Sequence, residues 1–278
     1  MKTVTTATQS DKATRFQALH QGPGAFVIPN PWDAGSARIL AGLGFQALAT
    51  SSGASASILG RRDGKVTREE ALAQARGIVE ATDLPVSADL EKGFGDSPET
   101  VAETIRLAGE VGLVGGLIED TTRDKDKPLY DIGYATERVA AAVKAARALP
   151  FAFTLTARTN SFSHGNADLE DTIKRLQAFE KVGADVLFAP GLPDLASVRA
   201  VCTALSKPFN FMVGIKGKSF TVAELEGVGV RRISLATSLY RAAISGLVEA
   251  ALEVKEKGTF GYLDRSLTTP ELIGLMRI

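Results

Sequence analysis

The sequence predicts an α/β protein of the (β/α)8 TIM-barrel class, and three observations lead to this class. Short apolar runs alternate with amphipathic helical patterns along almost the whole chain, which makes eight strand-then-helix units. Gly or Pro marks most of the turns between them. The length of 278 residues and the right-handed crossover rule also favour a closed barrel over an open doubly wound sheet, which usually stops at about five to seven strands.

Each expected strand is a short apolar run that ends in a turn or in polar residues, and each expected helix carries an apolar stripe. A short helix at 11–20, capped by Ser10 or Asp11, precedes the first unit. The runs that we interpret as strands are 25–28, 47–49, 86–88, 114–118, 151–157, 186–189, 209–213 and 232–235. The runs that we interpret as the following helices are 34–43, 68–81, 98–110, 134–148, 168–182, 194–205, 222–227 and 239–257.

We expect one domain over residues 1–278, with a short leader at about 1–10 and a helical tail at about 239–278. The last long helix is followed by Gly258-Thr259-Phe260-Gly261, a break that would let the tail reach a neighbouring subunit.

Composition excludes several classes of function. Lys+Arg and Asp+Glu are equal at 32 each, so the formal net charge is zero and the pI is about 6.8. This balance indicates neither a nucleic-acid nor an anionic-membrane partner. Cys202 is the only cysteine, which excludes an intramolecular disulfide and a Cys-rich zinc site. Neither a glycine-rich dinucleotide loop after the first strand nor a complete phosphate-binding Gly-x-x-x-x-Gly-Lys-Ser/Thr loop is present. No apolar run approaches the ~18 residues of a membrane span and the start lacks a signal-like segment, so we expect a cytoplasmic protein.

Carboxylates follow two neighbouring expected strands. Asp89 and Glu91 end the third apolar run, and Glu119 and Asp120 end the fourth. Active sites of such barrels lie at the carboxyl ends of the strands. One acid there could be an ordinary cap, but several acids at adjacent strand ends predict a divalent cation that compensates their charge.

Further polar residues fall at the same end of the predicted barrel. Arg158 is either a substrate contact or a structural partner of the carboxylates, and Asn210, inside its strand, is either barrel filler or a ligand. The full set at the strand ends is Asn30, Ser51, Ser52, Asp89, Glu91, Glu119, Arg158 and Asn210.

These motifs resemble the isocitrate lyase/phosphoenolpyruvate mutase superfamily over nearly the whole chain. The resemblance implies one Mg²⁺ or Mn²⁺ that binds a 2-oxo or 2-hydroxy carboxylate. It also implies a barrel whose eighth helix is exchanged between paired subunits, usually in a homotetramer built as a dimer of swapped dimers. The motifs that carry it are Thr50-Ser51-Ser52-Gly53, Arg62-Asp63-Gly64, Asp89-Leu90-Glu91-Lys92-Gly93-Phe94-Gly95, Ile118-Glu119-Asp120, Ala157-Arg158-Thr159-Asn160 and Gly183-Ala184-Asp185.

The resemblance also implies roles for single residues. Asp89 would bind the metal directly, and Glu91 and Glu119 would hold metal-bound waters. Arg158 would neutralise the substrate carboxylate. The resulting expectation is a catalytic set of Arg158, Asp63 and Glu119, a substrate-binding set of Ser51, Ser52, Gly53, Arg158 and Asn210, and a metal set of Asp89, Glu91 and Glu119.

The chain departs from two branches of this superfamily. The lyase branch has a cysteine in the loop after the Glu-Asp pair, whereas residues 121–128 contain neither cysteine nor histidine. Cys202, expected on the outside of the barrel, cannot replace it. The mutase branch has an aromatic residue where this chain has Ala49, and an Asn in its gating loop that 121–128 lacks. These departures disfavour isocitrate or methylisocitrate cleavage and phosphonopyruvate mutation, and the chain is closer to the phosphonomutase-like, oxaloacetate decarboxylase-like branch.

We therefore expect a Mg²⁺-dependent carbon–carbon lyase, either a decarboxylase or a retro-aldol enzyme, that acts on a small 2-oxo or 2-hydroxy acid such as oxaloacetate. The chemistry common to the superfamily is an enolate that the metal stabilises as the bond to C3 breaks. The alternatives are carbon–phosphorus chemistry, as a phosphonopyruvate hydrolase or phosphoenolpyruvate mutase, and a barrel that binds a keto acid without turnover.

Overall fold

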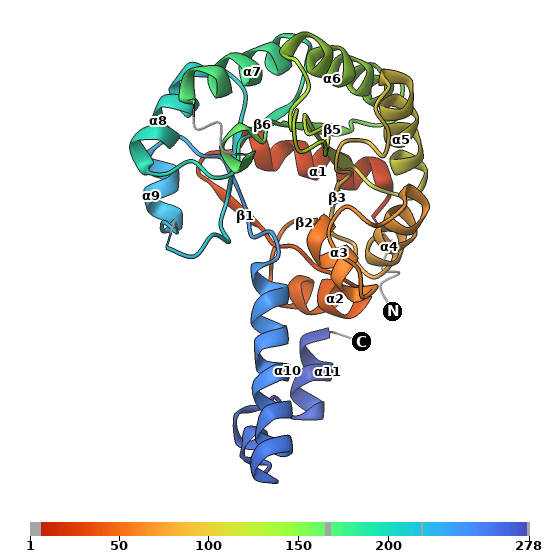
Figure 1. Cartoon of the computed structure of the whole chain (residues 1–278). Helices are drawn as coiled ribbons and strands as arrows, with labels where there is room; N and C mark the ends of the chain where they lie inside the picture. The colour runs from red at the N-terminus through yellow and green to blue at the C-terminus, as the bar shows by residue number, and fades with distance from the viewer. Residues whose placement is uncertain (1–6, 165–167, 218, 277–278) are drawn as a thin grey trace.

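The computed structural model describes residues 7–164, 168–217 and 219–276. Within them, eight strands form one parallel sheet in the order β1-β8-β7-β6-β5-β4-β3-β2, and helices surround it (Figure 1). This arrangement confirms the predicted (β/α)8 barrel. The strands are β1 (Phe26–Ile28), β2 (Leu48–Ala49), β3 (Val86–Asp89), β4 (Gly115–Glu119), β5 (Thr154–Arg158), β6 (Val186–Phe188), β7 (Phe209–Met212) and β8 (Arg232–Ser234).

The barrel is nearly closed. β1 pairs with β8, with Val27 opposite Ile233, and every neighbouring pair from β2 to β8 is parallel. Between β1 and β2, the N–H of Ala49 donates to the carbonyl of Pro29 at 3.0 Å. All carboxyl ends of the strands therefore lie at one end of the barrel, where the sequence places its polar residues.

The helices that follow the strands agree with the expected ones to within two residues at either end. They are α2 (Ala34–Gly42), α4 (Arg68–Glu80), α5 (Pro98–Glu110), α6 (Ile132–Arg147), α7 (Leu169–Lys181), α8 (Leu195–Ala204), α9 (Val222–Gly227) and α10 (Ser238–Lys257). The structure adds elements that the apolar periodicity does not indicate: α3 (Ser52–Ile58), η1 (Ser161–His164), η2 (Gly261–Arg265) and α11 (Thr269–Met276).

Local sequence explains where the helices begin. Thr67 and Glu70 form a reciprocal capping box at the start of α4. Ser97 caps α5, and Pro98 occupies its first turn, where a missing N–H costs nothing. Thr8 forms a similar box with Asp11, so α1 (Gln9–Gln21) begins inside the stretch expected to be a leader. Residues 1–6 of that expected leader lie outside the described residues.

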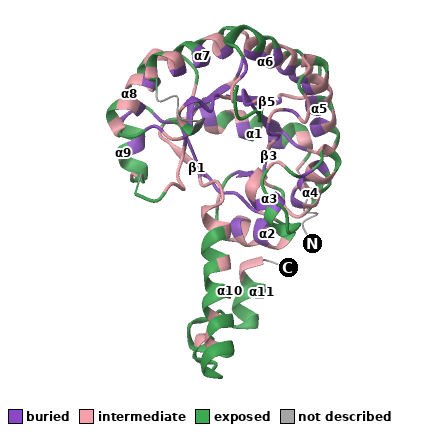
Figure 2. Ribbon diagram, viewed as in Figure 1, coloured by how far each residue is buried: buried purple, intermediate pink, exposed green. Residues whose placement is uncertain are grey.

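The main core lies between the strands and the surrounding helices, whose inner faces are buried (Figure 2). A smaller cluster lies at the amino end of the barrel, where Phe16 of α1 is fully buried together with Ile28 and Val114. α1 thereby covers the amino end and leaves the opposite end for ligands.

The last long helix does not cover its own barrel. α10 extends away from it, and α11 runs back beside it to contact α2 (Figure 1). α10 has no buried residue, and Leu247 and Val248 are among the exposed apolar side chains on it. None of the described helices combines the length and the hydropathy that crossing a membrane requires.

Candidate active site

Most of the predicted site residues surround one cavity at the carboxyl end of the barrel. The cavity has a volume of about 240 Å³. A neighbouring cavity of about 290 Å³ shares Ser52, Asp63 and Arg158 with it and adds Glu119. Glu91 lines neither of these two cavities. The predicted residues that line the first cavity are Asn30, Ser51, Ser52, Gly53, Asp63, Asp89, Arg158 and Asn210.

Asp89 ends β3 and points into the site. Its Oδ1 accepts a hydrogen bond from the N–H of Glu91 at 3.0 Å, and its Oδ2 lies 3.5 Å from the N–H of Ser52. Within residues 7–164, 168–217 and 219–276, Asp89 forms no ion pair. Backbone N–H groups thus position the Asp89 carboxyl group at the cavity, with no cationic side chain paired to it among the described residues.

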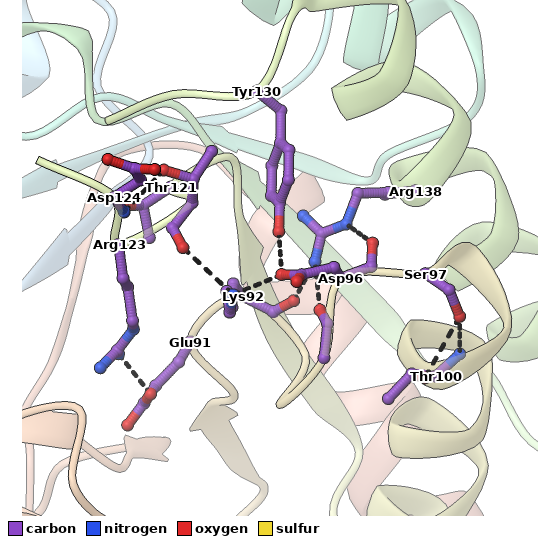
Figure 3. A network of polar contacts seen from close by, with 12 residues as sticks. Glu91, Lys92, Asp96, Ser97, Thr100, Thr121, Arg123, Asp124, Tyr130 and Arg138 are labelled. Carbon is purple, nitrogen blue, oxygen red and sulfur yellow. Dashed lines mark hydrogen bonds and ion pairs between the residues drawn. The ribbon is translucent and has the colours of Figure 1, made fainter. Parts of the chain in front are cut away.

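Glu91 forms an ion pair with Arg123, which comes from the loop after β4 (Figure 3). Burial raises the pKa of the Glu91 carboxyl to about 7, and the negative charge of Asp89 adds to the effect while Arg123 opposes it. The Arg123 guanidinium also occupies the space beside Gly64, where a Cβ atom would overlap it. Arg123, in the loop after β4, therefore contacts two other loops at the mouth of the barrel, the one that contains Glu91 and the one that contains Gly64.

Glu119 and Arg158 end the neighbouring strands β4 and β5, and Asn160 connects them. The Asn160 amide donates to Glu119 Oε2 at 2.8 Å and accepts from Arg158 Nε at 2.7 Å, while Arg158 Nε lies 3.5 Å from Glu119 Oε2. Burial raises the pKa of Glu119, and Arg158 opposes this shift. The Arg158 guanidinium also packs over the Phe188 ring, 5.1 Å from its centroid.

The acid after Glu119 has a structural role. Asp120 is buried, and it accepts hydrogen bonds from the Thr159 hydroxyl at 2.7 Å and the N–H of Asn160 at 2.9 Å. Arg175 of α7 forms an ion pair with it at 3.2 Å. Asp120 thus fixes the turn after β5 that carries Asn160.

The opposite wall of the cavity comes from β7 and β8. Asn210 lines the cavity, as either of its two interpretations allows, and its amide donates to the Ser234 hydroxyl at 3.1 Å. Arg232, two residues before Ser234 on β8, also lines the cavity and is buried. Asn210 Oδ1 is enclosed and has no hydrogen-bond partner within the described part of the chain.

With this geometry established, the relatives of the chain can be compared. The family model of phosphoenolpyruvate phosphomutase matches residues 16–255. The chain belongs to this family. It is thereby a member of the isocitrate lyase/phosphoenolpyruvate mutase superfamily, as the motifs predict.

Relatives of this family member cover nearly its whole length. The oxaloacetate decarboxylase of Marinomonas sp. (strain MWYL1) is 28% identical over 271 residues, which are 91% of this chain and 92% of that protein. The 2,3-dimethylmalate lyase of Eubacterium barkeri is 29% identical over 276 residues, 95% of this chain and 93% of that protein. A solved structure from Burkholderia cenocepacia J2315, classed provisionally as a lyase/mutase, has a TM-score of 0.95 at 48% identity and covers 97% of this chain and 98% of that one. Together the named relatives support a lyase enzyme.

The loop that lacks the lyase-branch cysteine is a short hairpin beside the site. Thr121 forms an antiparallel bridge with Leu129, and the N–H of Thr122 donates to the carbonyl of Pro128 at 2.9 Å. Cys202 lies in α8, lines a cavity at the amino end of the barrel, and burial raises the pKa of its thiol to about 12. It is therefore far from the acids and protonated, so it cannot supply the missing group.

The sequence patterns did not indicate several arginines that build the site. Arg138 of α6 is buried beneath the loop after β3 and donates to the backbone carbonyls of Lys92, Gly95 and Asp96 (Figure 3). It stacks on the Tyr130 ring at 4.3 Å. The one sequence signal for Arg138 was a charged residue on the apolar face of its helix. The only sequence signal for Arg123 was its position three residues after Asp120.

The family implies a divalent metal, and the donor set fits one. In the ranges that the structure describes, no three Asp, Glu, His or Cys side chains come close enough to hold an ion between them. The three predicted metal residues are thus not assembled as three direct ligands, because Arg123 engages Glu91 and Asn160 engages Glu119. Asp89, which forms no ion pair among the described residues, together with the nearby Glu119 suits Mg²⁺, which keeps several waters and takes one or two carboxylates.

Proposed function

We propose that this protein is a Mg²⁺-dependent carbon–carbon lyase that acts on a small 2-oxo or 2-hydroxy carboxylic acid. The observation that carries the proposal is the placement of Asp89, which has no ion-pair partner among the described residues, opposite Arg158 in one small cavity. An anionic substrate and a cation would each meet a group of the opposite charge there.

The carboxylates at the ends of β3 and β4 would bind the metal and its waters. Asp89 would hold the metal directly, with Glu91 and Glu119 in reach of its waters. When bound, Mg²⁺ would polarise the substrate carbonyl and lower the energy of the enolate. Glu119 is buried and hydrogen-bonded to Asn160, so it offers a fixed acceptor rather than a mobile one.

The start of α3 would receive the substrate carboxylate. The first N–H groups of a helix have no acceptor within the helix, and Ser52 and Gly53 at the start of α3 both line the cavity. A Cβ atom at Gly53 would lie 2.9 Å from Thr237 Cγ2 and 3.7 Å from Asp63 Oδ2, so the missing side chain keeps this corner open. Arg158 packs over the Phe188 ring and donates a hydrogen bond to Asn160, and in this position its guanidinium would neutralise the carboxylate charge.

The relatives support the reaction class. Those named oxaloacetate decarboxylase and 2,3-dimethylmalate lyase both break carbon–carbon bonds of dicarboxylates. The hairpin at 121–128 lacks a cysteine, so a reaction that needs no proton from such a residue fits best. Oxaloacetate decarboxylation is one such reaction, because CO2 leaves without protonation, and a retro-aldol cleavage in which solvent protonates C3 is another.

The decisive assay measures, with Mg²⁺, the pyruvate released from oxaloacetate and the 2-oxo acid released by C2–C3 cleavage of 2-hydroxy dicarboxylates. We expect turnover above the metal-only background, and its loss by a factor of about 10³ or more in Asp89→Ala. Asp83→Asn removes an exposed acid at the amino end of the barrel and serves as the matched control. If none of these acids is turned over, or if Asp89→Ala leaves the turnover unchanged, the proposal is wrong.

Carbon–phosphorus chemistry is the second candidate, because the matching family model is that of phosphoenolpyruvate phosphomutase. Release of inorganic phosphate from phosphonopyruvate would identify a hydrolase, and its conversion to phosphoenolpyruvate would identify a mutase. Thermal stabilisation by pyruvate and Mg²⁺ without any product would instead indicate a barrel that only binds keto acids.

A further inference from the structure

Arg232 is a buried arginine at the floor of the candidate active site. Its side chain points from β8 into the barrel, only 3% of the residue is exposed, and it lines the same cavity as Arg158. Its Nη1 donates to the Thr156 hydroxyl at 3.0 Å, and its guanidinium lies 5.9 Å from the centroid of the Phe16 ring. Neither contact supplies a negative charge.

The charge of Arg232 is not compensated by the described residues. It takes part in no ion pair there, and its enclosed Nε has no acceptor. Burial lowers the pKa of Arg232 to about 10, and no carboxylate lies near enough to oppose that effect. An isolated buried charge is costly unless a counter-charge or hydrogen bonds replace the lost water. Because Arg232 lines the cavity, a ligand bound there could supply this counter-charge.

The depth of Arg232 separates it from Arg158. Thr156, its hydrogen-bond partner, precedes Arg158 by two residues on β5, which is roughly 7 Å along a strand. Arg158 therefore marks the mouth and Arg232 the floor of the cavity. The other walls at this depth include the small or apolar Ala49, Ala88 and Leu117, and the amide of Asn210, which is the register partner of Arg232 on β7.

We infer that Arg232 is a specificity-determining residue that binds the second, distal carboxylate of the substrate. This inference rests on the proposed function, in which the start of α3 and Arg158 receive the carboxylate next to the reacting carbon. A guanidinium is suited to this task because it can donate two parallel hydrogen bonds to a carboxylate.

A carboxylate bound to Arg232 has to keep its charge through the reaction. Loss of that group as CO2 would withdraw the charge from the guanidinium, which would then stabilise the substrate more than the transition state. In a retro-aldol cleavage of a 2-hydroxy dicarboxylate, the C2–C3 bond breaks and its electron pair spreads from C3 into the distal carboxylate. The C2 hydroxyl gives its proton to a base and becomes the carbonyl of the 2-oxo acid, and C3 takes a proton from solvent. Arg232 favours this outcome, because negative charge grows beside it.

The test compares two acids of similar size that differ at the distal end. With saturating Mg²⁺, titration calorimetry measures the affinity of racemic malate, which has a distal carboxylate, and of racemic 2-hydroxybutyrate, which has a methyl group there. We expect the wild-type protein to prefer malate by about tenfold or more, as hydrogen bonds to a charged group are worth about 1.5–3 kcal/mol. Arg232→Met should reduce this preference to within about threefold and leave the affinity for 2-hydroxybutyrate nearly unchanged.

Arg241→Met is the matched control, because Arg241 is an exposed arginine that lines the same cavity. It should keep the preference for malate. Equal weakening of both acids in Arg232→Met would show a purely structural residue and overturn the inference, as would loss of the preference in Arg241→Met alone. A wild-type protein that binds both acids within threefold of each other overturns it without any variant, even if Arg232→Met fails to fold.

The two proposals fail in different ways. A preference for malate that depends on Arg232, without turnover of any acid, would leave the subsite standing and refute the lyase. Turnover that depends on Asp89, without a preference for malate that depends on Arg232, would support the lyase and refute the subsite.

Discussion

His20 shows how a single buried group sets the response of the fold to acid. It lies at the amino end of the barrel between Phe16 and Phe26, its Nδ1 hydrogen-bonds the Phe16 carbonyl at 2.8 Å, and its Nε2 has no partner among the described residues. Burial lowers its pKa from 6.5 to about 3, and the charge of Arg232 adds to the effect. The imidazole is therefore neutral in the folded state.

The sign of the pH dependence follows from this shift. Between about pH 6.5 and 3 the unfolded chain binds a proton at His20 that the folded chain does not, so the contribution to stability is complete above 6.5 and is lost as the pH falls toward 3. The loss is about 1.4 kcal/mol per pH unit. We expect the free energy of unfolding of the wild type to fall between pH 6.5 and 4.5 by roughly 2–3 kcal/mol more than that of His20→Leu. Denaturant titrations at both pH values measure this, and parallel losses in the two proteins would contradict it.

At the scale of single residues, the sequence indicates what the site must contain but not how its charges are paired. The order of the strands places Asp89, Glu119 and Arg158 together, because parallel strands end at one edge. The sequence could not show that Glu91 faces Arg123, because that contact depends on the path of an irregular loop. Arg232 looked like part of an apolar strand, and only the closed barrel shows that it points into the cavity.

The loop after β3 illustrates how one element supports another. It needs left-handed backbone at Glu91, Gly93 and Phe94, with φ values of 53°, 85° and 59°. Arg138 of α6 holds this strained loop by its carbonyls, so helix α6 keeps Asp89 and Glu91 in position from outside the barrel.

Removal of this support should cost much stability. In Arg138→Met the part-buried loop carbonyls lose the donors that one buried guanidinium supplies, so we expect a loss of about 3–5 kcal/mol in the free energy of unfolding. The melting temperature would fall by about 10 °C. Arg106→Met on the exposed face of α5 is the control, since its ion pairs with Glu103 and Glu110 are solvated and should change stability by less than about 0.5 kcal/mol. Thermal unfolding monitored by circular dichroism compares the two, and similar melting temperatures would refute the role of Arg138.

Helices and strands could be predicted where a long periodic pattern determines them, which holds for the eight repeated units. α3 and α11 were missed for physical reasons. α3 is a seven-residue helix of small residues, Ser52–Ile58, and carries no apolar stripe long enough to recognise. α11 lies against α2, so a tertiary contact rather than local pattern accounts for its position.

At the scale of the whole molecule, α10 and the segment after it form an arm with apolar side chains in water (Figure 2). Large exposed apolar patches mark interaction surfaces. The exchange of the eighth helix between subunits, implied by the resemblance, stays a proposal that would cover this arm. The exposed residues are Leu247, Val248, Leu252, Val254, Phe260, Leu263, Leu267, Leu272 and Ile273.

We expect light scattering to give a mass that is a multiple of 29.3 kDa, four times for a tetramer. Leu247→Glu combined with Leu263→Glu should lower that mass at micromolar concentration, since charges would replace apolar contacts in the interface. Val222→Glu changes a comparably exposed residue on α9, away from the arm, and should leave the mass unchanged. A monomeric wild-type protein would count against the exchange.

The most direct test of the account is the binding of Mn²⁺, followed by electron paramagnetic resonance in the wild type, in Asp89→Asn and in Asp83→Asn. Because Asp89 is the proposed direct ligand, we predict one bound Mn²⁺ per chain in the wild type and in Asp83→Asn, and an affinity at least about 100-fold lower in Asp89→Asn. Equal binding by all three proteins, or no binding by the wild type, would contradict the central claim that Asp89 places a divalent cation at the mouth of this barrel.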